Sequence, residues 1–198
     1  LQQGGSQVGG VLGIARQLQR RDRDAVGFKH RLHGQRVQPA LASLQGGLLD
    51  SSAEGFGQAM DISCHSFVRM ARQAASLMKD GGTMFTMSYY GANKVVPNYN
   101  LMGPVKAALE ACARYLAYEL GPRHIRVHAM SPGPLKTRAG SGLKDFDLLL
   151  AQAAERAPLG ELVDIMDVGF ACAFLATPYA RRLSGETMYV DGGVHIMA

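Results

Sequence analysis

Short apolar stretches alternate with longer stretches of helical periodicity from residue 48 onward, and this alternation restricts the fold more than any other feature of the chain. Three stretches have the length and apolar content of buried strands: residues 83–88, 125–133 and 187–193. Four others repeat apolar residues at helical spacing: residues 51–78, 99–120, 143–156 and 164–176. Strands that alternate with helices form βα units, so the sequence predicts an α/β fold with a parallel sheet.

The residues at the ends of these stretches indicate where the helices begin and end. Ser51 and Glu54 have the spacing of a capping box, which predicts the start of the first helix. The glycines of "KDGG" (79–82) predict its end. Gly121 followed by Pro122 predicts the end of the helix expected at 99–120.

The first 47 residues differ from the rest in charge and composition. They contain seven Lys or Arg and two Asp, whereas residues 48–198 contain 14 basic and 14 acidic residues. The net charge of +5 therefore belongs to this first segment, which also has eight Gln, nine Gly and little periodicity. We predict that residues 1–47 are a disordered leader and that residues 48–198 form one domain. We expect no nucleic-acid partner, because Phe28 is the only aromatic residue among these basic ones.

Several kinds of protein and site do not fit the sequence. No apolar run approaches the roughly 18 residues that a membrane-spanning helix needs, and no secretory signal is recognisable. The three cysteines are far apart, and His30 and His33 lack an accompanying carboxylate or cysteine. We expect a cytoplasmic protein with no membrane partner and no metal site.

A glycine cluster, "GGSQVGGVLGIA" (4–15), has the composition of a nucleotide-binding turn but not its pattern. Such a turn follows a strand, and its glycines let the backbone approach a pyrophosphate at a helix N-terminus. Only three residues precede Gly4, and the spacing does not match GxGxxG. We expect a flexible segment there rather than a cofactor site.

Two pairs of tyrosine and lysine in "SYYGANKVVPNYNLMGPVK" are candidates for proton transfer. A free phenol has a pKa of about 10, and an adjacent ammonium lowers that pKa because it favours phenolate. Tyr90 and Lys94 are four residues apart, but a glycine and a proline nearby favour a loop. Tyr99 and Lys106 are seven residues apart, which is two turns along one helix face. Spacing alone leaves open both pairs, and also a Tyr99 that is only packed with a Lys106 that is only a surface charge.

The second half of the chain resembles the short-chain dehydrogenase/reductase superfamily. The similar stretches are "KAALEACARYLAYELGPRHIRVHAMSPGPLKT" and "YVDGG". Most members have a tyrosine four residues before the lysine, where this chain has Met102, and here a tyrosine lies seven residues before Lys106 instead. That shift resembles one branch, the NADH-dependent enoyl-(acyl-carrier-protein) reductases of bacterial fatty-acid synthesis. The stretch "SYYGANKVVPNYNLMGPVKAALEA" is similar to that branch almost throughout.

This resemblance implies a Rossmann-like, doubly wound parallel sheet and assigns roles to individual residues. Tyr89 and Tyr99 match the tyrosines of the family's active site, and Lys106 matches its cofactor-binding lysine. The stretch "GPLKTRAGSGLKDF" (133–146) resembles the family's nicotinamide and substrate loop. The implied cofactor contacts come from Leu135, Lys136, Thr137, Arg138 and Ala139. The implied acyl slot is lined by Tyr89, Met102 and Phe146.

The implied reaction is the reduction of a trans-2-enoyl thioester carried by acyl carrier protein. NADH delivers hydride to C3, and Tyr99 hydrogen-bonds to or protonates the enolate oxygen that results. Lys106 holds the hydroxyls of the nicotinamide ribose. The resemblance also implies a homo-oligomer, which is a tetramer in the family.

The resemblance covers about residues 48–198, and residues 1–47 depart from it. The family begins with a strand and a Gly-rich turn, and neither is recognisable in this first segment. We therefore expect a truncated sheet that lacks these parts, through a frameshift or a misassigned gene start. The alternative function is an inactive remnant of such a reductase that cannot bind NADH. A ketone or alcohol dehydrogenase of the same superfamily is a weaker alternative, because Met102 replaces the usual tyrosine.

Overall fold

A computed structural model of the chain describes residues 47–135 and 146–197. The expected leader up to residue 46 and the glycine cluster lie outside these residues. The helices and strands are α2 (Ala53–Met60), α3 (Ser66–Leu77), β1 (Gly82–Met87), α4 (Met102–Leu120), β2 (Ile125–Pro132), α5 (Phe146–Arg156), α6 (Ile165–Ala176) and β3 (Thr187–Val190). Among them, no helix is long and apolar enough to cross a membrane.

The three strands form one parallel sheet in the order β1–β2–β3. The pairing of β1 with β2 runs from Gly82 opposite Ile125 to Met87 opposite Met130. The second half of β2 pairs with the whole of β3. The predicted α/β fold with a parallel sheet is therefore confirmed, and all three strands end at the same edge of the sheet.

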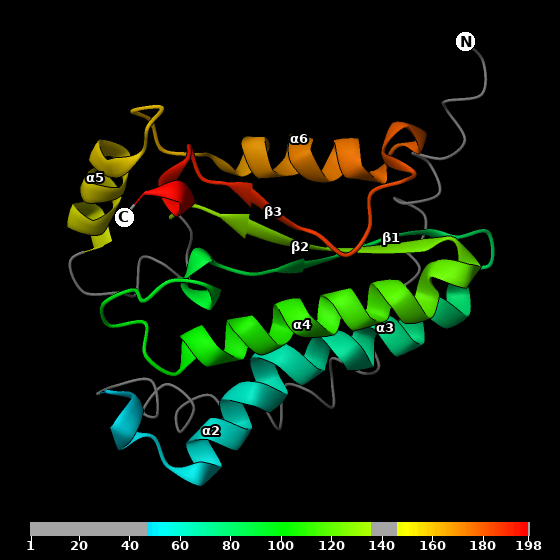
Figure 1. Cartoon of the computed structure of the whole chain (residues 1–198), viewed down its shortest axis with the longest axis horizontal. Coiled ribbons are helices and arrows are strands. Elements are labelled where there is room, and N and C mark those ends of the chain that lie inside the picture. The colour runs from blue at the N-terminus through cyan, green and yellow to red at the C-terminus, as the bar shows by residue number, and fades with distance from the viewer. Residues whose placement is uncertain (1–46, 136–145, 198) are drawn as a thin grey trace, which may run out of the picture. The chain divides into compact units, whose positions relative to one another are not determined.

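Helices cover both faces of this sheet. Figure 1 shows α6 on one face and α4, with α3 beside it, on the other. The central strand β2 is buried on both sides, as expected for a strand with two covered faces. Its fully buried apolar side chains are Ile125, Val127, Ala129 and Met130. The face of α4 that is buried repeats at helical spacing and consists of Val105, Leu109, Ala113 and Leu116.

The first helix begins one residue later than predicted. The N-cap is Ser52, whose side chain accepts a hydrogen bond from the Gly55 N–H at 3.0 Å. The hydroxyl of Ser51 instead donates to the Leu48 carbonyl. The capping box predicted at Ser51 is therefore wrong, because the turn before the helix already uses that side chain.

The helix predicted at 99–120 begins at Met102, so Tyr99 lies in the turn before it. Asn98 and Asn100 have φ angles of 63° and 44°. These left-handed conformations are incompatible with a right-handed helix, and asparagine adopts them more readily than most residues. The prediction that Tyr99 and Lys106 share one helix face is therefore wrong.

A π-helical turn, Asp61–His65, interrupts the helix predicted between residues 51 and 78. It turns the buried side chain of Cys64 toward α4, where the Cys64 and Cys112 sulfurs lie 3.7 Å apart. Burial raises the pKa of the Cys64 thiol to about 11, and the contact with Cys112 contributes in the same direction. Cys64 is therefore a packed, protonated thiol at neutral pH.

The ring of His128 on β2 is fully buried and stacks against Phe85, with the ring centroids 6.1 Å apart. Neither ring nitrogen has a hydrogen-bond partner of good geometry in the described part of the chain. Burial lowers the pKa of His128, and the charge of Arg126 lowers it further. The Leu183 backbone and Glu186 act in the opposite direction, but more weakly. The fold therefore accommodates the neutral ring.

We expect the protein to lose stability as the pH falls below about 6.5, the pKa of histidine in an unfolded chain. Below that pH the unfolded state binds a proton that the folded state excludes, which costs up to about 1.4 kcal/mol per pH unit. Urea unfolding at pH 7.5 and pH 5.5 should show this loss in the wild type and a smaller loss in His128→Asn. His124→Asn, at an exposed histidine, is the control. An unchanged pH dependence in His128→Asn would contradict the prediction.

Candidate active site

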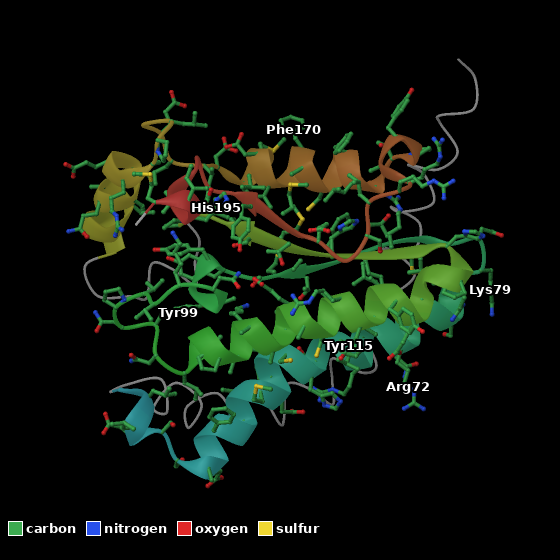
Figure 2. The ribbon with its side chains drawn as sticks, viewed as in Figure 1. Arg72, Lys79, Tyr99, Tyr115, Phe170 and His195 are labelled. Atoms are coloured by element: carbon green, nitrogen blue, oxygen red, sulfur yellow. The ribbon has the colours of Figure 1, made fainter. Side chains whose placement is uncertain are left out.

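The carboxyl edge of the sheet carries the residues that the sequence analysis singled out. In open α/β sheets, ligands bind at this edge. After β1 the chain passes through Ser88, is extended at Tyr89 and then enters a 3₁₀ turn at Tyr90–Ala92. In Figure 2, Tyr99 before α4 and His195 near the C-terminus lie toward the same end of the sheet.

Three tyrosine rings pack together at this edge. The Tyr89 ring meets Tyr99 edge to face with centroids 4.9 Å apart, and its centroid lies 4.5 Å from that of Tyr90. A Cβ atom at Gly91 would lie 2.6 Å from the Tyr99 ring, so the packing requires glycine at that position. Aromatic pairs at such distances stabilise a fold by about 0.5–1.5 kcal/mol beyond the burial of their area. Packing therefore fixes the relative positions of Tyr89 and Tyr99.

Both Tyr89 and Tyr99 are protonated phenols at neutral pH. Burial raises the pKa of Tyr99 above its ordinary value. Burial also raises the pKa of Tyr89, and a hydrogen bond with Tyr90 adds to the effect. The expectation that an adjacent ammonium lowers the phenol pKa is therefore wrong for Tyr99, because desolvation dominates. A buried neutral phenol is a hydrogen-bond donor and a source of a proton.

Lys106 lies in the second turn of α4, with its side chain against the end of β1. Its Nζ donates a hydrogen bond of 2.7 Å to the Met87 carbonyl. Burial lowers the pKa of Lys106, while the Glu110 carboxylate partly restores it because it favours the charged form. An ammonium has three N–H donors, and Met87 is its only acceptor within residues 47–135 and 146–197. The other two donors have no partner among these described residues.

Tyr99 and Lys106 reach the end of β1 from different elements. Tyr99 comes from the turn before α4 and contacts the residue two positions beyond the strand. Lys106 comes from the helix and bonds to the last residue of the strand. Tyr99 and Lys106 therefore both contact the chain at or just after the end of β1, and they do not share a helix face.

The side chains of the rival pair, Tyr90 and Lys94, have different partners. Tyr90 packs against Tyr89. Lys94 is exposed and donates to the carbonyl of Met197 near the C-terminus. The predicted loop contains one 3₁₀ turn, Tyr90–Ala92, and no longer helix.

The remaining predicted residues are described only in part. Met102 is the first residue of α4, and its N–H donates to the Tyr99 carbonyl at 3.0 Å. Leu135 is half-buried, three residues beyond β2. Residues Lys136, Thr137, Arg138 and Ala139 and the side chain of Phe146 lie outside the described residues.

Sequence reasoning missed a polar network beside the tyrosines, which is buried at Ser88 and Glu110 and exposed at Asn93. The hydroxyl of Ser88 donates to a carboxyl oxygen of Glu110 at 2.5 Å, and both residues are buried. The side-chain amide of Asn93 donates to the other Glu110 oxygen and to the hydroxyl of Tyr189. The sequence did contain a signal, because Glu110 is the only charged residue of "AALEACA" and lies four residues after Lys106.

A second carboxylate, Asp191, organises the turn after β3. It is buried and accepts hydrogen bonds from the Gly193 and His195 N–H groups and from the His195 ring. The His195 ring stacks on Tyr189 with centroids 3.9 Å apart. Over the described part of the chain, no three His, Cys, Asp or Glu side chains are grouped so that they could hold a metal ion.

Comparisons with known proteins identify the family of the chain. The model of the enoyl-(acyl carrier protein) reductase family matches residues 31–195. An enoyl-(acyl-carrier-protein) reductase (NADH) of Rickettsia bellii is 45% identical over 170 residues, which are 86% of this chain and 64% of the relative. The enzyme of that name from Aquifex aeolicus is 46% identical over 154 residues, which are 77% of this chain and 57% of the relative.

Solved structures of enoyl-acyl carrier protein reductases also align with this chain. The enoyl-acyl carrier protein reductase of Bacillus cereus, with NADP+ and an indole naphthyridinone, aligns with a TM-score of 0.77 and 42% identity over 79% of this chain and 61% of that chain. The reductase of Anaplasma phagocytophilum, in complex with NAD, aligns with a TM-score of 0.72 and 44% identity over 78% of this chain and 57% of that chain.

A parallel sheet with helices on both faces, shared with these solved structures, places the chain among Rossmann-like α/β proteins. The match to the family model extends over most of the sequence. The chain therefore belongs to the enoyl-(acyl carrier protein) reductase family. It spans less than two thirds of the length of the relatives named above.

Gly91→Ala should destabilise the protein by about 1–3 kcal/mol, because the added Cβ overlaps the Tyr99 ring. Urea unfolding measures the loss, and the near-ultraviolet circular dichroism of the tyrosines should change with it. Gly57→Ala is the matched control, since nothing lies within 4 Å of a Cβ placed there on helix α2. That control should gain up to about 1 kcal/mol in helix propensity. Equal stability of the two variants would refute the packing argument.

Proposed function

We propose that the chain catalyses the NADH-dependent reduction of trans-2-enoyl-(acyl carrier protein) in fatty-acid biosynthesis. The observation that carries the proposal is the packing of Tyr89 on Tyr99 at the strand end where Lys106 is anchored. The names of the Rickettsia and Aquifex relatives support NADH as the reductant. The NAD complex of the Anaplasma relative supports the same class of cofactor.

The described residues fit the nicotinamide–ribose end of NADH. Lys106 has N–H donors beyond the one that Met87 accepts, and hydroxyl groups of a ribose are suitable acceptors. In this proposal Leu135, Lys136, Thr137, Arg138 and Ala139 contact the nicotinamide and the phosphates. When bound, NADH supplies the hydride that C3 of the enoyl thioester accepts.

Tyr99 acts on the thioester oxygen in this proposal. Because burial keeps its phenol protonated, Tyr99 donates a hydrogen bond to that oxygen as negative charge develops there. It then protonates the enolate, or water does so. Tyr89 holds the Tyr99 ring through the edge-to-face contact and, with Met102 and Phe146, lines the acyl slot. Lys106 adds a positive charge to the same region.

We further propose that the protein is a cytoplasmic homo-oligomer that receives its substrate from acyl carrier protein. Tyr115 and Tyr118 lie three residues apart on α4 and are 71% and 83% exposed. Other exposed apolar side chains come from α2, α3 and the π-helical turn between them: Phe56, Ile62, Met70 and Leu77. So much exposed apolar surface on neighbouring helices supports an interface with a second copy of the chain.

Tyr99→Phe should lower turnover of an enoyl thioester by about 10²–10⁴-fold, as is typical for the loss of an acid–base group, with little change in NADH affinity. Lys106→Ala should lower both turnover and NADH affinity, because it removes a charge and a ribose contact. Absorbance of NADH at saturating thioester measures turnover, and calorimetric titration measures cofactor affinity.

Tyr90→Phe and Lys94→Ala are the matched controls and should retain nearly full activity. Activity that survives Tyr99→Phe but not Tyr90→Phe would assign the site to the rival pair. A folded wild type that neither binds NADH nor turns over the thioester would instead support an inactive remnant.

The double variant Tyr115→Glu/Tyr118→Glu should dissociate the oligomer, because it places two charges in the proposed interface. Light scattering after size-exclusion chromatography gives the mass of each variant. Tyr179→Glu, an 86% exposed tyrosine outside α4, should leave the mass unchanged. If only Tyr179→Glu dissociated the oligomer, the interface would not include α4, and the proposed location would be wrong.

A further inference from the structure

A carboxylate on α4 lies where an apolar side chain would be expected. Glu110 is only 4% exposed, and its helical neighbours Leu109 and Ala113 belong to the core. Burying a charged or polar group is costly unless hydrogen bonds compensate it. A buried Glu110 therefore implies specific partners, and those partners indicate what the residue does.

The two partners bracket the segment that carries the site tyrosine. Ser88 donates to one oxygen of Glu110 at 2.5 Å, and Asn93 donates to the other at 3.3 Å. Ser88 precedes Tyr89, and Asn93 follows the 3₁₀ turn at Tyr90–Ala92. One carboxylate thus ties both ends of a six-residue segment to helix α4.

The same segment has further ties at each end. At its start, the Ser88 N–H donates to the Met130 carbonyl at 2.7 Å, which extends the β1–β2 pairing by one step. At its end, the Asn93 amide also donates to the Tyr189 hydroxyl at 2.8 Å. Between the two ends, Tyr89 meets Tyr99 and Gly91 lies against the Tyr99 ring. A change in the course of the segment would therefore move the tyrosine pair.

We propose that Glu110 is a positioning residue whose carboxylate clamps residues 88–93 and so holds Tyr89 against Tyr99. Its importance for turnover rests on the proposed function, whereas the clamp itself does not.

A carboxylate suits this task because it offers two acceptor oxygens to two donors on different parts of the chain. Alanine at position 110 would leave the buried Ser88 hydroxyl without this partner. Glutamine would retain much of the clamp, since its oxygen accepts from Asn93 and its amide donates to the Ser88 hydroxyl, which also accepts. The two substitutions therefore separate the loss of the clamp from the loss of the charge.

Hydrogen exchange of the full-length chain tests the clamp without substrate or cofactor. The N–H groups of Ala92, Asn93 and Lys94 bond to carbonyls within the segment and report on its opening. In Glu110→Ala these amides should exchange at least ~10-fold faster, as expected when a local opening costs about 1.4 kcal/mol less. In Glu110→Gln the exchange rates of these amides should be much closer to those of the wild type. Glu119→Ala, at an exposed position on the same helix, is the control.

A second measurement follows the tyrosine pair directly. After incorporation of 3-fluorotyrosine, the ¹⁹F resonance of Tyr99 is identified by its absence in Tyr99→Phe. Glu110→Ala should shift or broaden this resonance, and Glu119→Ala should not. The proposal is overturned if the resonance and the exchange of residues 92–94 are unchanged in Glu110→Ala. It is also overturned if the amides of β2 accelerate by the same factor, because the residue would then act on global stability alone.

Turnover then separates this proposal from the proposed function. If the wild type reduces an enoyl thioester, Glu110→Ala should lower kcat at least ~10-fold with a smaller change in KM, and Glu110→Gln should recover most of the loss. The wild type could instead show no turnover while the exchange and ¹⁹F results are as expected. That outcome would contradict the proposed function and still support the positioning role of Glu110.

Discussion

The burial of β2 on both faces is the constraint on which the other features of this protein depend. A strand covered by α4 on one side and α6 on the other is buried along most of its length, and it pairs in parallel with β1 and β3. Parallel pairing brings the ends of the strands to one edge. The helix that crosses from β1 to β2 therefore has two tasks: Val105 and Leu109 fill the core, while Lys106 between them reaches the end of β1.

Sequence reasoning predicted the elements better than the site. The strand and helix stretches depend on local periodicity, and the structure contains each of them within a few residues. Tyr99 was placed on a helix because two asparagines with left-handed backbone leave no mark in apolar periodicity. The hydrogen bond between Asn93 and Tyr189 joins residues 96 positions apart, which no spacing rule relates. The contact between Ser88 and Glu110 follows no spacing rule either, although an acid at an apolar position of the stretch "AALEACA" was a visible anomaly.

Desolvation shifts the pKa values of three side chains near the end of β1, upward for the two tyrosines and downward for the lysine. Desolvation keeps the phenols of Tyr89 and Tyr99 neutral, and it also disfavours the charge of Lys106. The Glu110 carboxylate partly offsets the effect on Lys106, while the phenols stay protonated. The edge of the sheet thus combines a neutral hydrogen-bond donor with a lysine amine, and groups of this kind stabilise an oxygen on which negative charge develops.

Hydrogen bonds between the C-terminal residues and the tyrosine segment have a consequence for the order of folding. Lys94 bonds to the Met197 carbonyl across 103 positions, and Asn93 reaches Tyr189 on the last strand. Contacts this distant in sequence form late, because the chain between them must first be ordered. During synthesis the tyrosine segment emerges well before the residues that brace it. We therefore expect the tyrosine segment to reach its final arrangement only once β3 has paired with β2, so that a delay in that pairing also delays completion of the site.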